Sequence, residues 1–377
     1  MGTRCPRIGV VCYPSPGGSG IVATELGLAM ADRGCAVHFI SYAPPVRLRR
    51  YAENIQFHQV FTDNYPVFHH PPYTLSLATK LVEVVREHRL DLVHVHYAIP
   101  HATCAFLARE MLGEQRIRTV TTLHGTDITL VGVQPAFHTT VRFSIERSDG
   151  VTAVSAWLRD RSLEAFELTK EIEVIPNFVD IERFRPDRKP VGLASFRQEG
   201  RLVVMHASNF RAVKNLPAVI GTFARIAEAL PANLVLVGEG PELPATHAQV
   251  QELGLEDRVH FLGMQNAIED LLVQSDLLLQ PSRHESFGLT ALEAMACGVP
   301  VVTTNQGGTA ELIEQDVSGF LADPDDLEGM AGWAIRTLGD PARRRAVAEA
   351  ARARVVERFD RRRIVDLYLE FYERVLS

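Results

Sequence analysis

The chain has 377 residues, with 39 Lys and Arg against 46 Asp and Glu, which gives a formal net charge of −7. This length favours two domains over a single hydrophobic core. A hydrophobic content of 46% and a charged content of 23% are typical of a globular protein, and they exclude a disordered or collagenous chain. The acidic balance gives no general attraction to phosphate polymers, so we expect no nucleic-acid partner.

The cysteines and the apolar runs indicate the cellular compartment of the protein. No two cysteines have the C-x-x-C spacing, so we expect neither a disulfide framework nor a zinc knuckle. No apolar run approaches the roughly 18 residues of a membrane helix, so we expect no stable membrane insertion. A reducing cytoplasm fits both features. The five cysteines are Cys5, Cys12, Cys35, Cys104 and Cys297.

In the first half of the chain, short apolar runs alternate with helical patterns, which is typical of βα units around a parallel sheet. The first run leads into Gly17-Gly18-Ser19-Gly20 and then a helical pattern over 21–33, which we expect to end at Gly34. The predicted strands are 8–12, 37–41, 91–96, 119–123, 150–154 and 172–175. Together they predict one doubly wound domain.

The alternation lapses over residues 177–200, which we interpret as a linker, and then restarts. The predicted strands are 202–206, 233–237, 259–262, 277–280 and 299–303, and the predicted helices are 216–229, 268–274 and 288–296. We therefore expect an α/β fold with domains at 1–180 and 181–358. The arginine-rich stretch 340–359 is interpreted as a solvated helix face, and 359–377 as a C-terminal helix that packs back toward the N-terminal domain.

Two facing domains of this kind create a cleft at the carboxyl ends of their strands, where α/β sheets bind ligands. The glycines at 17–20 follow the first strand, and they suit either a phosphate-binding turn or a simple tight turn. Arg211 and Lys214 follow the first strand of the second domain. Two cations there could neutralise the charge that develops on a diphosphate leaving group.

Glu285 comes just before a predicted helix, and Glu293 lies eight residues later, near one face. One carboxylate could hold sugar hydroxyls and the other a ribose diol, while the backbone amides of Phe287, Gly288 and Leu289 could hold an anion.

Histidines lie within or just after two predicted strands of the first domain. His124 ends a strand beside Gly125 and Asp127, which makes it a candidate for contact with reacting groups. His94, His96 and His101 lack a Cys or carboxylate at ligand spacing, so we expect no metal site. No G-x-S-x-G, H-E-x-x-H or P-loop motif occurs, which argues against those catalytic classes.

Taken together, Gly17-Gly18, His124 to Asp127, Arg211 with Lys214, and the E-x₇-E pair resemble the retaining glycosyltransferases of family 4. The resemblance implies the GT-B fold, two Rossmann-like domains that face each other across a cleft. Several stretches are similar to members that use UDP-N-acetylglucosamine as donor and L-malate as acceptor, in the first step of bacillithiol biosynthesis. They are 12–15, 17–20, 71–73, 96–101, 123–129, 142–143 and 294–300.

The resemblance also implies roles for individual residues. Arg211, Lys214, Glu285 and His124 would be catalytic, and no cofactor or metal ion would be required. The implied donor residues are Gly17, Gly18, Arg211, Lys214, Glu285, Phe287, Gly288, Leu289 and Glu293, and the implied malate residues are Ser19, Tyr97, Thr121 and Arg142. The choice of Thr121 over Thr122 depends on the strand register. A homo-oligomer is compatible with the sequence.

Two other functions remain open at this point. One is a UDP-sugar transferase that acts on an inositol phosphate or a lipid, for which residues 47–50 offer a small basic and apolar cluster. The other is a sensor that binds the nucleotide sugar without chemistry. Two departures from the family pattern are Thr309-Ala310 and Thr74.

Overall fold

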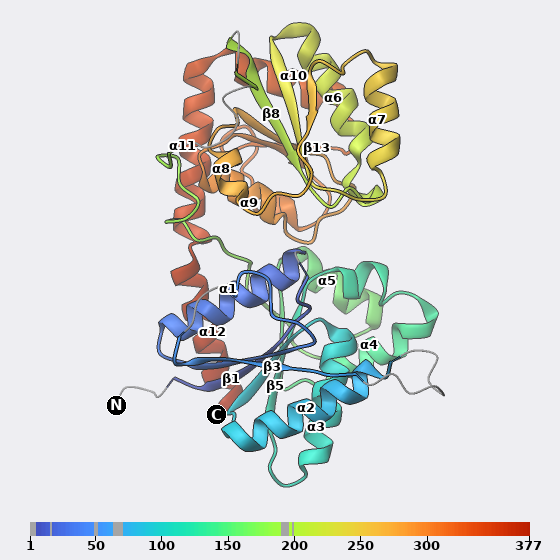
Figure 1. The fold of residues 1–377 in the computed structure, drawn as a ribbon, viewed down its shortest axis with the longest axis vertical. Helices are drawn as coiled ribbons and strands as arrows, with labels where there is room; N and C mark the ends of the chain where they lie inside the picture. Colours follow the sequence, from blue (N-terminus) through green and yellow to red (C-terminus); the bar gives the residue numbers. More distant parts are fainter. Residues whose placement is uncertain (1–4, 16, 49–51, 63–70, 190–195, 198–199) are drawn as a thin grey trace. The chain divides into compact units, whose positions relative to one another are not determined.

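The computed structural model describes residues 5–15, 17–48, 52–62, 71–189, 196–197 and 200–377, in two compact units (Figure 1). The first unit comprises residues 1–177 together with 362–377, and the second comprises 178–361. The last helix of the chain therefore belongs to the first unit. Arg49 and Arg50 of the basic cluster lie outside the described residues.

The first unit is built on a parallel sheet in the order β3-β2-β1-β4-β5-β6-β7. Its strands are β1 (Arg7–Val11), β2 (Ala36–Ser41), β3 (Ile55–Gln59), β4 (Leu92–His96), β5 (Arg118–Leu123), β6 (Gly150–Ala153) and β7 (Glu173–Val174). Its helices are α1 (Gly18–Asp32), α2 (Tyr73–His88), α3 (Thr103–Leu112), α4 (Pro135–Arg147), α5 (Ala156–Phe166) and α12 (Arg361–Leu376).

The second unit has a parallel sheet in the order β10-β9-β8-β11-β12-β13. Its strands are β8 (Leu202–Ala207), β9 (Ala232–Val237), β10 (Val259–Phe261), β11 (Leu277–Gln280), β12 (Val301–Thr304) and β13 (Phe320–Ala322). Its helices are α6 (Leu216–Ala229), α7 (Leu243–Glu252), α8 (Ile268–Leu272), α9 (Leu289–Ala296), α10 (Leu327–Gly339) and α11 (Pro341–Arg358).

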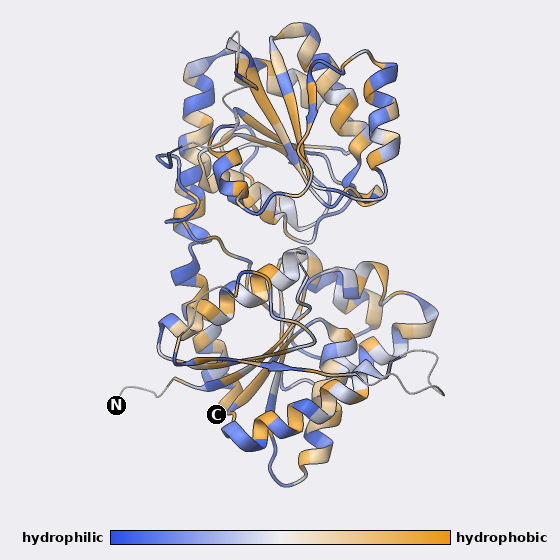
Figure 2. Cartoon of the chain, in the orientation of Figure 1, coloured by the Kyte–Doolittle hydropathy of each residue, from blue (hydrophilic) through white to orange (hydrophobic). Residues whose placement is uncertain are grey.

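The hydrophobic runs form the cores, as the sequence predicts. Central strands of both sheets are coloured hydrophobic in Figure 2, because helices cover both of their faces. In the first unit, side chains of β1, β2 and β4 pack against α2 and α3. In the second unit, β8, β9 and β11 pack against α6 and α10. The sequence patterns left several elements unassigned. These are the half-buried edge strand β3, strand β13, and the helices α2, α3, α4, α5, α7 and α10.

The side chains of strand β4 contact different helices on the two faces of the sheet. Val93 and Val95 point into the core with α2 and α3. His94, on the opposite face, hydrogen-bonds through Nδ1 with the Tyr372 hydroxyl of α12, at 2.6 Å. Arg33 at the end of α1 forms an ion pair with Asp366 of α12, at 2.5 Å. The C-terminal helix is therefore anchored to the first unit through both buried and surface contacts.

Two expectations need correction. Cys5 and Cys35 form a disulfide, so the expectation of unbonded cysteines is wrong for this pair. They precede the adjacent parallel strands β1 and β2, and that pairing brings their Cα atoms within 4.8 Å. The arginine-rich helix α11 is not simply solvated, because Arg352 bonds to the carbonyl oxygens of Phe184 and Ala296, each at 2.7 Å.

Candidate active site

The second unit places Arg211, Lys214 and Glu285 in the segments after β8 and β11, and these strands are neighbours. Because both strands are parallel, their carboxyl ends share one edge of the sheet. The Lys214 ammonium lies 2.5 Å from the Glu285 carboxylate, and the two side chains are 19% and 15% exposed. The Ser282 hydroxyl also donates to Glu285, at 3.1 Å. The edge thus holds a partly buried ion pair from residues 71 positions apart.

The backbone around Lys214 explains its placement. Residues 212–214 form a short 3-10 turn, and Asn215 follows with φ of 54° at the start of α6. The Asn215 side chain donates to the carbonyl oxygens of Pro281 and Pro324, both at 3.1 Å, which fixes the turn against two other loops. Arg211 begins the turn and is exposed. Arg211 therefore offers a solvent-accessible cation near a fixed Lys214.

Glu285 lies outside helix α9, which begins at Leu289. Glu285 therefore precedes the helix, as the sequence predicts, and its position relative to Glu293 depends on the intervening loop. The Gly308 N–H donates to the Glu285 carbonyl at 2.7 Å. A Cβ at Gly307, whose φ is 91°, would lie 2.2 Å from that same oxygen, so this close approach requires glycine.

The remaining donor candidates surround the first turn of α9. Gly288 precedes the helix with φ of 93°, and Leu289 is its first residue. Phe287 is buried and packs edge-on against Phe359, with ring centroids 5.9 Å apart. Glu293 is partly exposed on α9. The helix start, with its positive dipole end, thus lies four residues after Glu285.

In the first unit, Gly17 and Gly18 precede and begin helix α1. Gly17 is extended, and its carbonyl accepts from the Ile21 N–H at 3.2 Å. The Ser19 hydroxyl donates to the Tyr97 hydroxyl at 2.7 Å, so two predicted malate residues from α1 and the end of β4 are brought together. Both glycines are exposed, which leaves this turn accessible to a ligand.

The other two predicted malate residues, Thr121 and Arg142, do not take part in the hydrogen bond between Ser19 and Tyr97. Thr121 has no exposed surface, and its hydroxyl hydrogen-bonds with Ser148 at 2.7 Å. A direct contact between Thr121 and an acceptor would need this bond to open. Thr122 is equally buried and contacts His94. Arg142 is exposed on α4, with its guanidinium 3.6 Å from the Glu167 carboxylate.

His124 ends a column of stacked imidazoles on the α12 side of the sheet. His96 stacks on His94 with ring centroids 4.4 Å apart, and on His124 at 5.1 Å. His96 Nδ1 lies 2.8 Å from His124 Nε2. Burial lowers the pKa of His94 and of His124 to about 3, and it lowers the pKa of His96 as well. These rings are therefore neutral at pH 7.

The tautomers of His96 and His124 can be assigned from the hydrogen-bond partners of their ring nitrogens. His96 Nε2 is buried and has no hydrogen-bond partner within the described structure. A buried N–H without an acceptor is rare, so we assign the proton of His96 to Nδ1, where it is donated to His124. His124 Nε2 then accepts, and the His124 proton resides on Nδ1. His124 is thus set to donate a hydrogen bond from a partly exposed ring.

Asp127 was part of the sequence motif but received no role there, and the structure gives it one. Its carboxylate accepts hydrogen bonds from the backbone N–H groups of Ala98 at 2.9 Å and Gly125 at 3.0 Å. It therefore ties the loop after β4 to the loop after β5. Burial raises its pKa to about 6, against the opposing effect of these N–H donors. In the sequence, the only indication of a role for Asp127 is its position three residues after His124.

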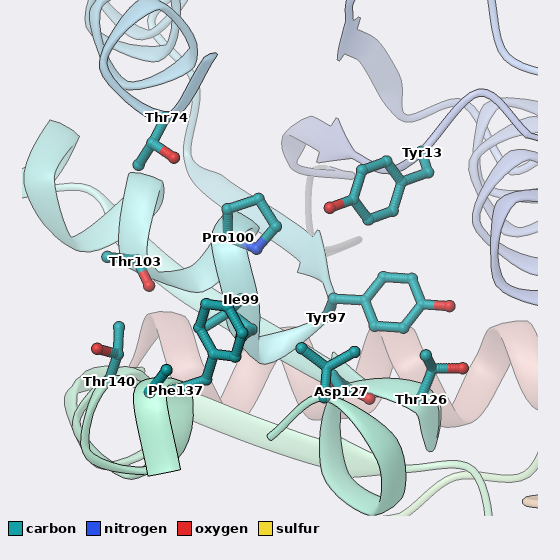
Figure 3. Close-up of a pocket in the computed structure, with 12 residues that line it drawn as sticks. Tyr13, Thr74, Tyr97, Ile99, Pro100, Thr103, Thr126, Asp127, Phe137 and Thr140 are labelled. Atoms are coloured by element: carbon teal, nitrogen blue, oxygen red, sulfur yellow. The ribbon is translucent and has the colours of Figure 1, made fainter. Parts of the chain in front are cut away.

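A pocket of about 600 Å³ opens beside this loop pair within the first unit (Figure 3). Tyr13, Tyr97, Pro100 and Phe137 are among its lining residues, and Asp127 is the charged group in the lining that the structure describes. A dicarboxylate would need cationic partners as well, so the pocket by itself suits an apolar or hydroxyl-bearing group.

Comparison with known proteins gives the class. Residues 16–183 match the model described as Glycosyltransferase Family 4, and residues 194–354 match Glycosyl transferases group 1. The chain is 46% identical to the N-acetyl-alpha-D-glucosaminyl L-malate synthase of Bacillus anthracis, over 98% of this chain and 97% of that protein. The chain therefore belongs to the family 4 glycosyltransferases, and the predicted GT-B fold class and enzyme class are confirmed.

Solved structures agree with this fold. A glycosyltransferase from Rickettsia africae has a TM-score of 0.83 at 20% identity and covers 99% of both chains. Anabaena Alr3699/HepE in complex with UDP-glucose has a TM-score of 0.78 at 26% identity, covering 98% of this chain and 99% of its own. Within the described residues, no helix has the length and apolar character needed to cross a membrane.

Proposed function

We propose that this protein transfers N-acetylglucosamine from UDP-N-acetylglucosamine to the hydroxyl of L-malate, with retention of configuration, as the first step of bacillithiol biosynthesis. The observation that carries the proposal is the near full-length similarity to the L-malate synthase, which extends through both units. The charged edge of the second unit supports it chemically, because a nucleotide diphosphate needs fixed cations.

The donor residues of the second unit lie at the carboxyl edge of its sheet and at the start of α9. Arg211 and Lys214 bind the diphosphate, and the backbone around Phe287, Gly288 and Leu289 assists. Glu293 holds the ribose diol, and Glu285 contacts the transferred sugar. Gly17 and Gly18 bring backbone N–H groups close to a phosphate.

Lys214 has two states in this scheme. Without substrate it neutralises Glu285, at 2.5 Å. With the donor bound, the ammonium serves the diphosphate, and Glu285 is then available for sugar hydroxyls. The pair thus keeps both side chains ordered before the substrate arrives, and the new contacts with the diphosphate and the sugar hydroxyls must offset the loss of the ion pair.

The acceptor is held by the first unit. Ser19 and Tyr97 provide hydroxyls that are already joined at 2.7 Å, and Arg142 provides a guanidinium for a carboxylate. Thr121 contributes only if its bond to Ser148 opens. His124 donates from Nδ1 to the transferred sugar, in the tautomer that His96 sets.

In the transfer step, the bond between the sugar anomeric carbon and the β-phosphate oxygen breaks, and the malate hydroxyl oxygen bonds to that carbon on the same face. The hydroxyl proton passes to a phosphate oxygen of the departing UDP. No metal ion or other cofactor is required in this proposal, because Arg211 and Lys214 stabilise the leaving group. We place the enzyme in the cytoplasm; the free cysteines Cys12, Cys104 and Cys297 suit that compartment, whereas the Cys5–Cys35 disulfide is uncommon there.

The test is UDP release by the purified chain with UDP-N-acetylglucosamine and either L-malate or an inositol phosphate, with and without EDTA. We expect release that depends on malate and is unchanged by EDTA, with an α-linked product by NMR. Release with inositol phosphate alone would favour the rival transferase. Donor binding by calorimetry with no turnover would favour a nucleotide-sugar sensor.

A further inference from the structure

Three histidines from three elements converge in the first unit, outside the proposed substrate residues. His38 is on β2, His58 is on the edge strand β3, and His88 is the last residue of α2. One nitrogen atom from each ring lies within 4.8 Å of the corresponding atoms of the other two. The ring centroids are 4.4 to 5.2 Å apart.

The sheet register explains why the rings meet. His58 pairs with Ile40, and His38 lies two residues before Ile40 on the same strand, so all three side chains share one face. Ile40 packs in the core formed with α2, which shows that this face is the one that α2 covers. The end of α2 then brings His88 over the two strand histidines.

The cluster places two of its ring nitrogens in direct contact. His38 Nδ1 and His58 Nε2 are 2.9 Å apart and share one hydrogen bond. An ion that binds both of these nitrogens replaces the hydrogen bond, and the shared proton then moves to the other nitrogen of its own ring.

The charges around the cluster are mixed. Arg7 lies near His38, and Lys80 and Glu87 lie near His58. Arg7 is paired with Asp91 at 2.7 Å, and Lys80 with Glu83 at 2.5 Å, which offsets their positive charge. The Glu87 carboxylate lies 3.8 Å from His88 Nε2, within reach of an ion at the cluster.

We propose that His38, His58 and His88 form a binding site for a divalent transition-metal ion, best suited to Zn²⁺, separate from the glycosyl-transfer residues. Three imidazole nitrogens at Zn–N distances of about 2.0–2.1 Å make three corners of a tetrahedron, and water or Glu87 completes it. In this geometry the nitrogens, which now lie within 4.8 Å of one another, are roughly 3.4 Å apart, so the rings have to reorient when the ion binds. The ion would fasten the edge strand β3 to the end of α2.

The experiment measures Zn²⁺ bound to the full-length, EDTA-treated protein by equilibrium dialysis, with a chromophoric chelator as competitor. We expect one Zn²⁺ per chain, and a rise in Kd of at least about tenfold in both His58→Gln and His88→Gln. The matched control is His260→Gln, which removes a half-buried strand histidine in the second unit and should leave the Kd unchanged.

Two further readouts keep the proposal testable if a variant folds poorly. Zn²⁺ should raise the melting temperature of the unsubstituted protein and of His260→Gln, but not that of His58→Gln. X-ray absorption at the zinc edge of the unsubstituted protein should show nitrogen neighbours at about 2.0 Å and no sulfur. Absence of stoichiometric zinc, sulfur ligation, or an unchanged Kd in both cluster variants would overturn the proposal. None of these readouts depends on glycosyl transfer.

Discussion

Replacing Lys214 with alanine removes the ammonium that lies 2.5 Å from Glu285 and that we assign to the diphosphate. The site is only 15–19% exposed, so solvent cannot replace the lost charge fully. Loss of one preorganised group of this kind costs about 2.7–4 kcal/mol in the transition state, so kcat should fall about 100- to 1,000-fold. Glu285 would keep the Ser282 hydroxyl as a partner at 3.1 Å, so the folded state should lose only about 1–3 kcal/mol.

The assay is steady-state UDP release with malate saturating, together with urea unfolding of each variant. The matched control is Arg283→Ala, which removes a half-exposed cation from the neighbouring loop, where Arg283 pairs with Asp325 at 3.1 Å. That variant should keep kcat within about threefold, since exposed ion pairs contribute little. Near-normal kcat in Lys214→Ala, or equal losses in Lys214→Ala and Arg283→Ala, would refute the assignment of Lys214 to the leaving group.

Three other predictions concern the first unit. Arg142→Ala should raise the KM for malate about tenfold or more with little change in the donor KM, and a change in the donor KM alone would place the acceptor elsewhere. His96→Leu should lower kcat about tenfold by releasing the His124 tautomer, whereas His96→Asn, whose amide can donate in place of Nδ1, should restore most of it; equal losses in both variants would indicate packing instead. His94 has a folded pKa of about 3, below the unfolded value of about 6.5, so its contribution to stability is complete above pH 6.5 and falls by roughly 2 kcal/mol at pH 5. In His94→Gln, the slope of the unfolding free energy against pH between pH 4 and 6 should therefore decrease by the amount that corresponds to about one bound proton. An unchanged slope would contradict a buried neutral ring at His94.

The βα pattern predicted the central strands well because those strands are buried on both faces and read as apolar runs. Strands β1, β4 and β8 begin and end within one or two residues of the ranges predicted from the sequence. The predicted helix after the first strand is confirmed as α1, and Gly34 follows it with φ of 91°. The edge strand β3 has a weaker apolar pattern in the sequence, because an edge strand is less buried and needs fewer apolar residues.

The candidate donor residues could be located because they follow strands, and parallel strands deliver their loops to one edge. What the local pattern could not supply was the contact between Lys214 and Glu285, which depends on β8 and β11 being neighbours. The disulfide between Cys5 and Cys35 has the same origin in the pairing of β1 with β2. Contacts between distant segments depend on strand order, and local periodicity carries little information about it.

Local sequence thus determined the α/β class, the central strands and the loops that carry charge, since periodicity and glycine placement act over a few residues. Tertiary structure alone decided which face of a strand each histidine occupies and what covers that face. His94 and His96 lie on the α12 side of the first sheet, while His38 and His58 lie on the α2 side. The physical reason is that the neutral imidazole column forms only once α12, from the far end of the chain, has packed onto the sheet, and the three-histidine cluster forms only once α2 has packed over β2 and β3.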